Sequence, residues 1–158
     1  MSIDFSKNSL DINKNSFPSE NICWIVADIT KIKFVPKSVD LLIMSDFIQH
    51  IMGFNKRIEF VNDALQSLKP NGKFYLSFFN FNLINYLKGD RVGSFSGKKI
   101  PYERMNSHEI INRLKNVKIN RIIYNGYSYN YYIDKFISNF PFTKYLARYA
   151  IIEGEKIK

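Results

Sequence analysis

The order of apolar and polar stretches along the chain predicts strands that alternate with helices. Residues 22–27, and residues 39–44 apart from Asp40, are apolar at successive positions, which is typical of strands buried on both faces of a parallel sheet. Between residues 57 and 69, apolar side chains recur at intervals of three and four and predict an amphipathic helix, which Pro70-Asn71-Gly72 is expected to end. Residues 73–79 are predicted to form the next strand. The apolar stripe of the helix consists of Ile58, Phe60, Val61, Ala64, Leu65 and Leu68.

Two shorter helices are expected on either side of this segment. Ser6 has the side chain of a good N-cap and is expected to begin a helix that holds Leu10 and Ile12. Ser107 is expected to cap a second helix, which runs through Leu114 and carries an acidic residue in its first turn.

The C-terminal half also contains two predicted strands, at residues 117–124 and 145–152. The aromatic residues 127–142 fit neither a helical nor a strand period. Residues 80–104 contain three glycines and are expected to be irregular, and a loop of that length is more often a functional loop or lid than a plain connector. The whole pattern predicts a single α/β domain over residues 1–158.

Composition and charge add limits to this picture. The chain has 158 residues, 46% of them hydrophobic and 23% charged, as in an ordinary globular domain, and it has no apolar run of the ~18 residues that a membrane helix needs. Its one cysteine, Cys23, lies in an apolar run and is expected to be a buried thiol, which fits a reducing, cytoplasmic setting. Residues 86–158 carry 14 Lys/Arg and 6 Asp/Glu, a net charge of +8 out of +9. That charge can attract nucleic acid, although a general bias of the composition is the favoured explanation.

Acidic residues end three of the predicted strands. Ligands of open α/β sheets bind at the carboxyl ends of the strands, where Asp4, Asp28 and Ser45-Asp46 are expected. A carboxylate accepts two hydrogen bonds at once, so Asp4 can hold both ribose hydroxyls of a nucleoside, and Asp28 can accept from an exocyclic amine. Phe5 and Ile29 follow these acids and are placed to sandwich a flat base. The alternative is that both aspartates are turn residues or helix caps.

Four stretches in the same order and spacing resemble class I S-adenosylmethionine-dependent methyltransferases of the small-molecule type. The first, IDFSKNSLDI from Ile3, is similar to the end of that family's second strand and the helix after it. WIVADIT from Trp24 is similar to its third strand with the adenine-binding acid, and SVDLLIMSD from Ser38, with Gln49-His50-Ile51 following, to its fourth. LQSLKPNGKF from Leu65 resembles its helix–Pro–Gly–strand passage. The resemblance is dense as far as Asn80 and looser to Lys158.

The resemblance implies a fold, a cofactor and a set of roles. The fold would be a Rossmann-like class I methyltransferase sheet, mostly parallel with an antiparallel C-terminal strand. S-adenosyl-L-methionine would be the cofactor, a small-molecule O, N or C nucleophile the acceptor, and residues 80–104 a lid or acceptor-binding loop; no metal is implied. The implied cofactor contacts are Asp4 to ribose, Phe5 and Ile29 flanking adenine, Asp28 facing its amino group, and Ser45 and Asp46 bordering the methionine part and the transferring methyl.

Two histidines are candidates for proton transfer. His50 is the only plausible general base near the implied site, because an imidazole exchanges protons close to neutral pH. The favoured alternative is that His50 only packs or hydrogen-bonds at the start of a helix. His108 lies beside a predicted helix cap and is expected to be structural.

The glycine-rich turn of that family, Asp-x-Gly-x-Gly-x-Gly after its first strand, has no counterpart here. The chain has seven glycines and none forms Gly-x-Gly. Met1 corresponds to a place within the second strand, so we expect a sheet that is N-terminally truncated, without the first strand, the loop and the first helix. Three hypotheses follow: a fragment of a complete methyltransferase, a non-catalytic methyltransferase-like subunit whose partner chain supplies the missing strand, or a basic nucleic-acid-binding module. Nucleic acid and membrane are the partners expected least, and activity of this chain alone stays open.

Overall fold

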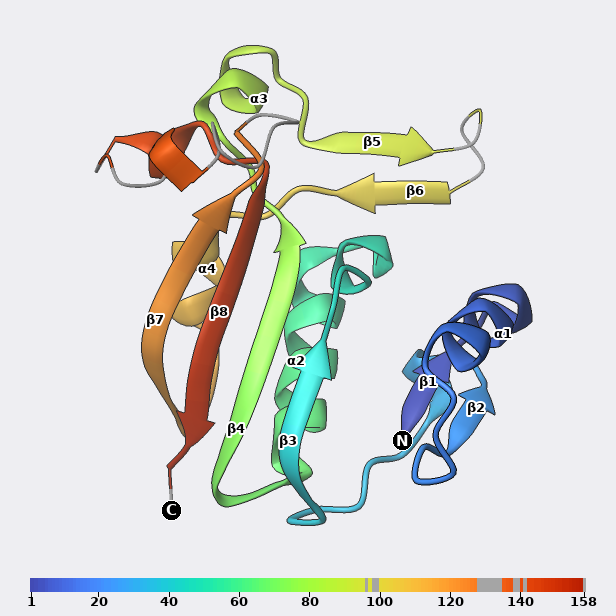
Figure 1. The fold of residues 1–158 in the computed structure, drawn as a ribbon. Coiled ribbons are helices and arrows are strands. Elements are labelled where there is room, and N and C mark those ends of the chain that lie inside the picture. The colour runs from blue at the N-terminus through green and yellow to red at the C-terminus, as the bar shows by residue number, and fades with distance from the viewer. Residues whose placement is uncertain (96, 98–99, 128–134, 138–139, 141, 158) are drawn as a thin grey trace. The chain divides into compact units, whose positions relative to one another are not determined.

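The computed structural model describes residues 1–95, 97, 100–127, 135–137, 140 and 142–157. These residues form two compact units, Met1–Phe34 and Val35–Lys158, and each is described by itself (Figure 1). Among the described helices none is long and apolar enough to cross a membrane.

The first unit contains two parallel strands, β1 (Ser2–Asp4) and β2 (Trp24–Val26), joined by the helix α1 (Lys7–Ser16) and followed by the 3₁₀ turn η1 (Ile29–Lys31). Ser6 caps α1 as predicted, because its hydroxyl accepts a hydrogen bond from the Ser9 amide at 3.2 Å. The helix buries Leu10.

Burial of the second strand was predicted wrongly. The strand is shorter than residues 22–27, the side chain of Val26 is exposed, and Cys23 is an exposed thiol. The first unit has one helix, which can cover only one face of its two-stranded sheet. Apolar side chains on the other face of β2 therefore stay exposed to water within this unit.

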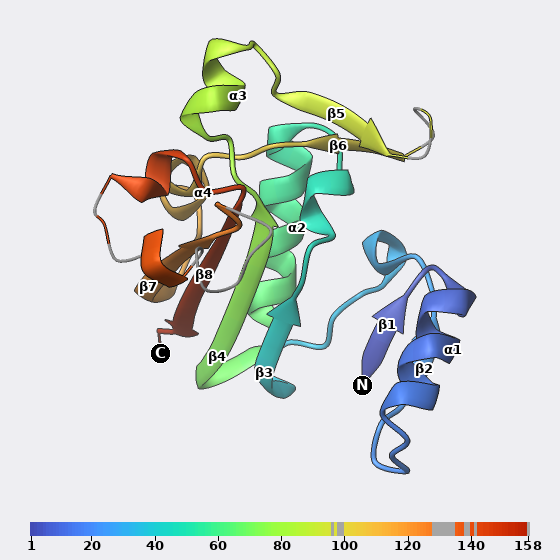
Figure 2. The same ribbon diagram turned by 45° about the horizontal axis from the view of Figure 1, so that its top comes forward.

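The second unit is built on a four-stranded sheet in the order β3-β4-β8-β7. Its strands are β3 (Val39–Met44), β4 (Leu68–Phe79), β7 (Val117–Asn125) and β8 (Tyr149–Lys156). β3 and β4 are parallel, and β8 runs antiparallel to both of its neighbours. The helices α2 (Phe54–Gln66) and α4 (Ser107–Ile111) lie on one face of this sheet (Figures 1 and 2). The parallel sheet with one antiparallel C-terminal strand is therefore confirmed.

The core of this unit lies between the sheet and α2. From Phe74 to Phe79, alternate residues of β4 are buried completely, as expected for a strand with one face on the core, and the intervening ones are half-buried. The predicted stripe of α2 is buried at Ile58, Val61, Ala64 and Leu65, with Leu68 buried at the start of β4. The buried residues of this alternating part of β4 are Phe74, Leu76 and Phe78.

The end of α2 differs from the prediction. The helix ends at Gln66, and Pro70-Asn71-Gly72 belongs to β4, where the pairing with β3 is irregular. Asn71 takes a left-handed backbone with φ 63°, and a Cβ at Gly72 would come within 2.9 Å of the Lys69 carbonyl oxygen. The tripeptide therefore forms a bulge in a strand rather than the stop of a helix.

Residues 80–104 are not irregular, contrary to expectation. They contain the short helix α3 (Leu83–Leu87) and an antiparallel hairpin of β5 (Val92–Phe95) and β6 (Ile100–Glu103). Four residues, Gly97 among them, separate the two strands in the sequence, which is a weaker hairpin signal than a two-residue Asn-Gly turn, and a proline lies inside β6.

Two smaller predictions also need correction. Asn106, and not Ser107, caps α4, because its side-chain oxygen accepts from the His108 amide at 2.9 Å, while the Ser107 hydroxyl pairs with the Tyr124 hydroxyl. β8 begins at Tyr149, since residues 143–145 form the 3₁₀ turn η3. Most of the unassigned aromatic stretch, residues 128–134, 138–139 and 141, lies outside the described residues.

Candidate functional site

The first unit brings its two candidate acids to one edge. β1 and β2 are parallel, with Asp4 opposite Val26, so Asp4 and Asp28 both leave at the carboxyl ends of these strands. Phe5, next to Asp4, is 75% exposed, which leaves its ring available for stacking, and Ile29 is half-buried.

Both acids also have local roles, as the alternative interpretation predicted: Asp28 caps η1, and Asp4 accepts a hydrogen bond in the turn before α1. Oδ1 of Asp4 accepts from the Ser6 amide at 2.8 Å. Oδ1 of Asp28 accepts from the amide and the hydroxyl of Thr30, at 3.0 and 2.7 Å, and Lys31 lies 3.4 Å from Oδ2. These hydrogen bonds from Thr30, followed by those of Lys31, lower the pKa of Asp28. A capping carboxylate keeps lone pairs for a ligand, so capping does not exclude the binding role.

In the second unit, Asp46 is held in a defined position at the carboxyl end of β3. Its backbone is left-handed, with φ 50°, a conformation that aspartate adopts more readily than most residues. The Ser77 hydroxyl donates to Oδ1 of Asp46 at 2.7 Å and accepts from the Asp46 amide at 3.0 Å, and Gln49 donates to the Asp46 carbonyl at 2.7 Å. Oδ2 has no hydrogen-bond partner in the part of the chain that the structure describes.

An open pocket of about 380 Å³ lies over this carboxylate. It gathers residues from the carboxyl ends of β3 and β7, from β4 and from the start of β8, which meet at one end of the sheet because β8 is antiparallel. The residues that line it are Ser45, Asp46, Ser77, Asn125, Gly126, Tyr149 and Ile151. Sequence reasoning placed Ser45 and Asp46 here but did not find Ser77, Asn125 or Tyr149, which come from distant segments.

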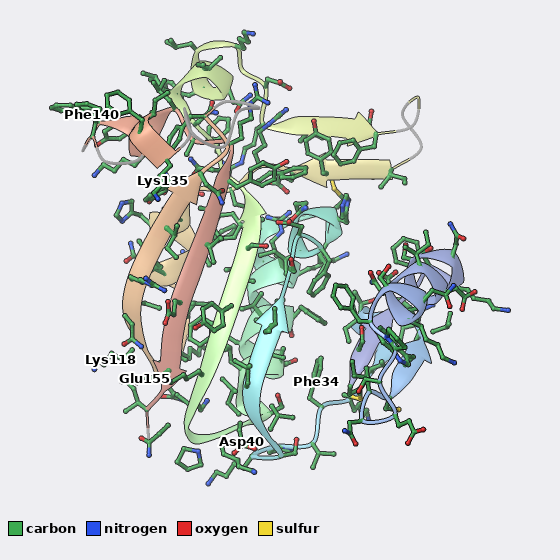
Figure 3. All side chains as sticks on the ribbon, in the orientation of Figure 1. Phe34, Asp40, Lys118, Lys135, Phe140 and Glu155 are labelled. Atoms are coloured by element: carbon green, nitrogen blue, oxygen red, sulfur yellow. The ribbon has the colours of Figure 1, made fainter. Side chains whose placement is uncertain are left out.

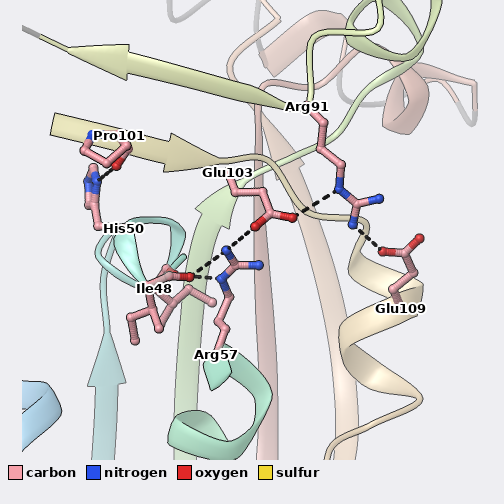
Figure 4. Close-up of polar contacts among 8 residues, drawn as sticks. Ile48, His50, Arg57, Arg91, Pro101, Glu103 and Glu109 are labelled. Carbon is pink, nitrogen blue, oxygen red and sulfur yellow. Dashed lines mark hydrogen bonds and ion pairs between the residues drawn. The ribbon is translucent and has the colours of Figure 1, made fainter. Parts of the chain in front are cut away.

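His50 ends the 3₁₀ turn η2 (Ile48–His50), which follows β3. Its Nδ1 lies 2.9 Å from the carbonyl oxygen of Pro101 in β6 (Figure 4). A carbonyl oxygen can only accept, so Nδ1 carries the proton in the neutral ring and Nε2 is left with a lone pair. The ring of Phe95 in β5 lies 6.2 Å away, centroid to centroid, so both strands of the hairpin contact this histidine.

A fully buried arginine joins the same hairpin to the turn. Arg57, in the first turn of α2, donates to the carbonyls of Ile48 and Ile51 at 2.9 and 2.7 Å and to Glu103 of β6 at 2.9 Å (Figure 4). Arg91 bridges Glu103 to Glu109 of α4. The remaining nitrogen of Arg57, Nη1, has no partner among the described residues.

The ionisation of Glu103 reflects this arrangement. Burial alone would raise the pKa of Glu103, but the hydrogen bond and charge of Arg57, with the Gly53 amide and Arg91, outweigh burial and lower it. Sequence reasoning missed Arg57, although one signal was present: Arg57 lies four residues before Val61, on the apolar stripe, where a cation requires a buried partner.

Comparisons with known proteins agree with this architecture. Residues 1–76 match the family model described as a methyltransferase domain. A Listeria monocytogenes protein described as an S-adenosylmethionine-dependent methyltransferase has a similar structure, with a TM-score of 0.73 and 17% identity over 99% of this chain and 78% of its own. The sequences of curated proteins gave no match.

Two further solved structures are relevant to binding partners. A Burkholderia thailandensis N-methyltransferase with bound 1,6-didemethyltoxoflavin and S-adenosylhomocysteine has a TM-score of 0.61 and 10% identity, over 99% of this chain and 60% of its own. A Haloferax volcanii methyltransferase in complex with the Trm112 activator has a TM-score of 0.64 and 14% identity, over 99% and 71%.

The fold is the Rossmann-like fold of the class I methyltransferases. The chain is similar to this family of S-adenosylmethionine-dependent enzymes: a methyltransferase family model matches residues 1–76, and solved methyltransferases share the fold. S-adenosylmethionine is the cofactor of this class. The residues of the first unit fit its adenosine part, because the exposed ring of Phe5 and the carboxylates of Asp4 and Asp28 lie at one edge. No Gly-x-Gly is present in the sequence for its amino acid end.

Proposed function

We propose that this chain takes part in the transfer of a methyl group from S-adenosylmethionine to an O, N or C nucleophile of a small molecule. The observation that carries the proposal is the fixed carboxylate of Asp46 beside an open pocket at the carboxyl end of β3. The pocket volume of about 380 Å³ is in the range of small-molecule sites, roughly 300–1,000 Å³. A reducing, cytoplasmic setting is part of the proposal and rests on the single cysteine.

The adenosine part of the cofactor is assigned to the first unit. Asp4 would accept from the ribose hydroxyls, and Asp28 from the adenine amino group. Phe5 and Ile29 would stack on the base. The lowered pKa keeps Asp28 ionised and therefore able to accept at neutral pH.

The acceptor is assigned to the pocket of the second unit. Oδ2 of Asp46 would accept from an N–H or O–H of the acceptor, and Tyr149 and Ile151 supply apolar walls. The similar Burkholderia enzyme, which holds a heterocyclic small molecule, supports an acceptor of this size. The bound cofactor supplies an electrophilic methyl on a sulfonium, and the protein's contribution to such a displacement is mainly positioning. Nε2 of His50 is the atom that would take up the acceptor's proton.

The test is calorimetry of the 158-residue chain with S-adenosylmethionine, followed by transfer of a labelled methyl group to a panel of small amines, phenols and heterocycles. We expect binding in wild type, loss of binding in Asp4→Ala, and loss of transfer with retained binding in Asp46→Ala. Asp40→Ala is the matched control, because Asp40 lies on the same strand but pairs with Lys69 at its amino end. Equal methyl-transfer activity of Asp46→Ala and Asp40→Ala would mean that the pocket beside Asp46 does not bind the acceptor.

A non-catalytic subunit that pairs with a partner chain is the second candidate. β3 is an edge strand of the described sheet, and it exposes Leu41 and Ile43 at 50% and 63%. Exposed apolar edge strands are templates for pairing with another strand. The complex of the similar Haloferax methyltransferase with an activator supports a partner of this kind. Tight binding of S-adenosylmethionine by the chain alone argues for the enzyme, and absence of binding until a partner is added argues for the subunit.

Nucleic acid is a weaker candidate than the basic composition suggests. A cross-strand ion pair joins Lys118 of β7 to Glu155 of β8 at 3.0 Å (Figure 3). A second one joins Arg121 to Glu153. These pairs neutralise part of the charge on the sheet. In a filter-binding titration, the chain is expected to show no affinity for nucleic acid at low salt.

A further inference from the structure

The turn that carries His50 and the strand that hydrogen-bonds its ring are held by the same arginine. The Nε of Arg57 donates to the carbonyl at one end of η2, and Nη2 donates to the Ile51 carbonyl just beyond its other end. Nη2 also donates to Glu103, which lies on β6 two residues after Pro101. Figure 4 shows that these contacts converge on one guanidinium.

The attachment of the β5–β6 hairpin to α2 is rigid because the groups that form it are buried. Arg57 has no exposed surface and the side chain of Glu103 is 13% exposed, so little water competes for their hydrogen bonds. The second oxygen of Glu103 lies 3.3 Å from Nε of Arg91, which in turn reaches Glu109 of α4. The hairpin is therefore tied to two helices, α2 and α4, through one carboxylate.

Among the described residues, the Pro101 carbonyl is the one group that hydrogen-bonds the imidazole of His50, and this contact selects a tautomer. An imidazole free in water favours the form with the proton on Nε2. A carbonyl held against Nδ1 reverses this preference, because it accepts only from a protonated nitrogen. The position of the Pro101 carbonyl thus decides which nitrogen keeps a lone pair.

We propose that Glu103, through its ion pair with Arg57, is a positioning residue that fixes the neutral tautomer of His50 as Nδ1–H and leaves Nε2 as the proton acceptor. Glu103 acts through the β6 backbone and does not touch the imidazole. The functional meaning of the tautomer rests on the proposed role of His50 as a base, but the tautomer itself is independent of methyl transfer. A failure of one proposal is therefore distinguishable from a failure of the other.

The experiment is a long-range ¹H–¹⁵N correlation spectrum of the histidine rings in the full chain, recorded in mildly alkaline buffer. The chain has only two histidines, so His108 serves as an internal reference. Glu103→Ala breaks the link, Glu103→Gln keeps an acceptor oxygen for Arg57, and Glu109→Gln is the matched control at the exposed end of the same ion-pair chain.

We expect Nδ1–H for His50 in wild type and in Glu109→Gln. Glu103→Ala is expected to move the tautomer ratio toward Nε2–H by about five-fold or more, the weight of one hydrogen bond, with His108 unchanged. Glu103→Gln is expected to shift it less, in the same direction. An Nε2–H form in wild type, or a folded Glu103→Ala protein that keeps Nδ1–H, overturns the proposal. If Glu103→Ala does not fold, Glu103→Gln decides, and a ratio equal to that of Glu109→Gln overturns it.

Discussion

Replacing Arg57 with methionine tests how much the buried guanidinium stabilises the second unit. Methionine keeps the apolar stem that packs in the helix stripe and removes three hydrogen bonds, to Ile48, Ile51 and Glu103. Breaking a buried ion pair costs about 3–5 kcal/mol, because the remaining charge is left without a partner. The unpartnered Nη1 disappears as well, which offsets on the order of 1 kcal/mol.

The expected loss in the free energy of unfolding is therefore about 2–4 kcal/mol, a large part of the ~5–15 kcal/mol of a typical domain. The assay is urea unfolding followed by far-UV circular dichroism, since Trp24 lies in the first unit and its fluorescence does not report on the second. Adding Glu103→Gln to Arg57→Met is expected to recover about 1 kcal/mol or more, because it removes the uncompensated charge.

The control is Lys69→Met, which removes an ion pair that is largely exposed, with Lys69 46% and Asp40 80% accessible. That change is expected to cost less than about 1 kcal/mol. Two results would contradict this reasoning: Arg57→Met is no more destabilising than Lys69→Met, or the double variant is no more stable than Arg57→Met. Either would mean that the hydrogen bonds and ion pair of Arg57 do not stabilise the second unit as described.

Three further outcomes are expected. The folded-state pKa of Glu103 is below its ordinary value of 4.5, so the stability that its ionised form contributes is complete above pH 4.5 and is lost as the pH falls through the lower pKa. The free energies of unfolding of wild type and Glu103→Gln should therefore converge on acidification. A difference between them that stays constant with pH contradicts this. Gly154→Ala is expected to destabilise β8 by about 1–3 kcal/mol, because its Cβ would lie 2.6 Å from the Phe74 ring and the Lys118 carbonyl, and thermal unfolding no different from wild type refutes the clash. Cys23 is exposed and is expected to react with a thiol reagent in the native protein as fast as in urea; strong native protection argues otherwise.

The strands and the long helix could be predicted because their signals are local. The bounds of β3 are those of the predicted strand, residues 39–44, and the stripe of α2 is buried at nearly every predicted position. Burial of the strands could not be predicted in the same way, because it depends on what covers them. Leu41 and Ile43 are as apolar as buried residues, yet both are exposed on an edge strand.

The candidate site was only partly predictable for the same reason. Strand-ending acids such as Asp4 and Asp46 follow from periodicity. Their partners do not: Ser77 lies 31 residues from Asp46, and Pro101 lies 51 residues from His50. The hairpin that brings Pro101 to His50 has only a weak signal, Gly97 between two short strands, and nothing in the sequence pairs this hairpin with His50.

The placement of β8 has a consequence for how the second unit forms during synthesis. This strand follows β4 and β7 in the chain, lies between them and pairs with both, so the interior of the sheet is filled only after both of its neighbours have been synthesised. Until Tyr149–Lys156 is available, β4 and β7 each present an unpaired edge, and Phe74 lacks its cover at Gly154. Such pairing over long sequence separation slows folding and prolongs the exposure of aggregation-prone edges, so the nascent second unit is a natural client for chaperones that shield unpaired strands.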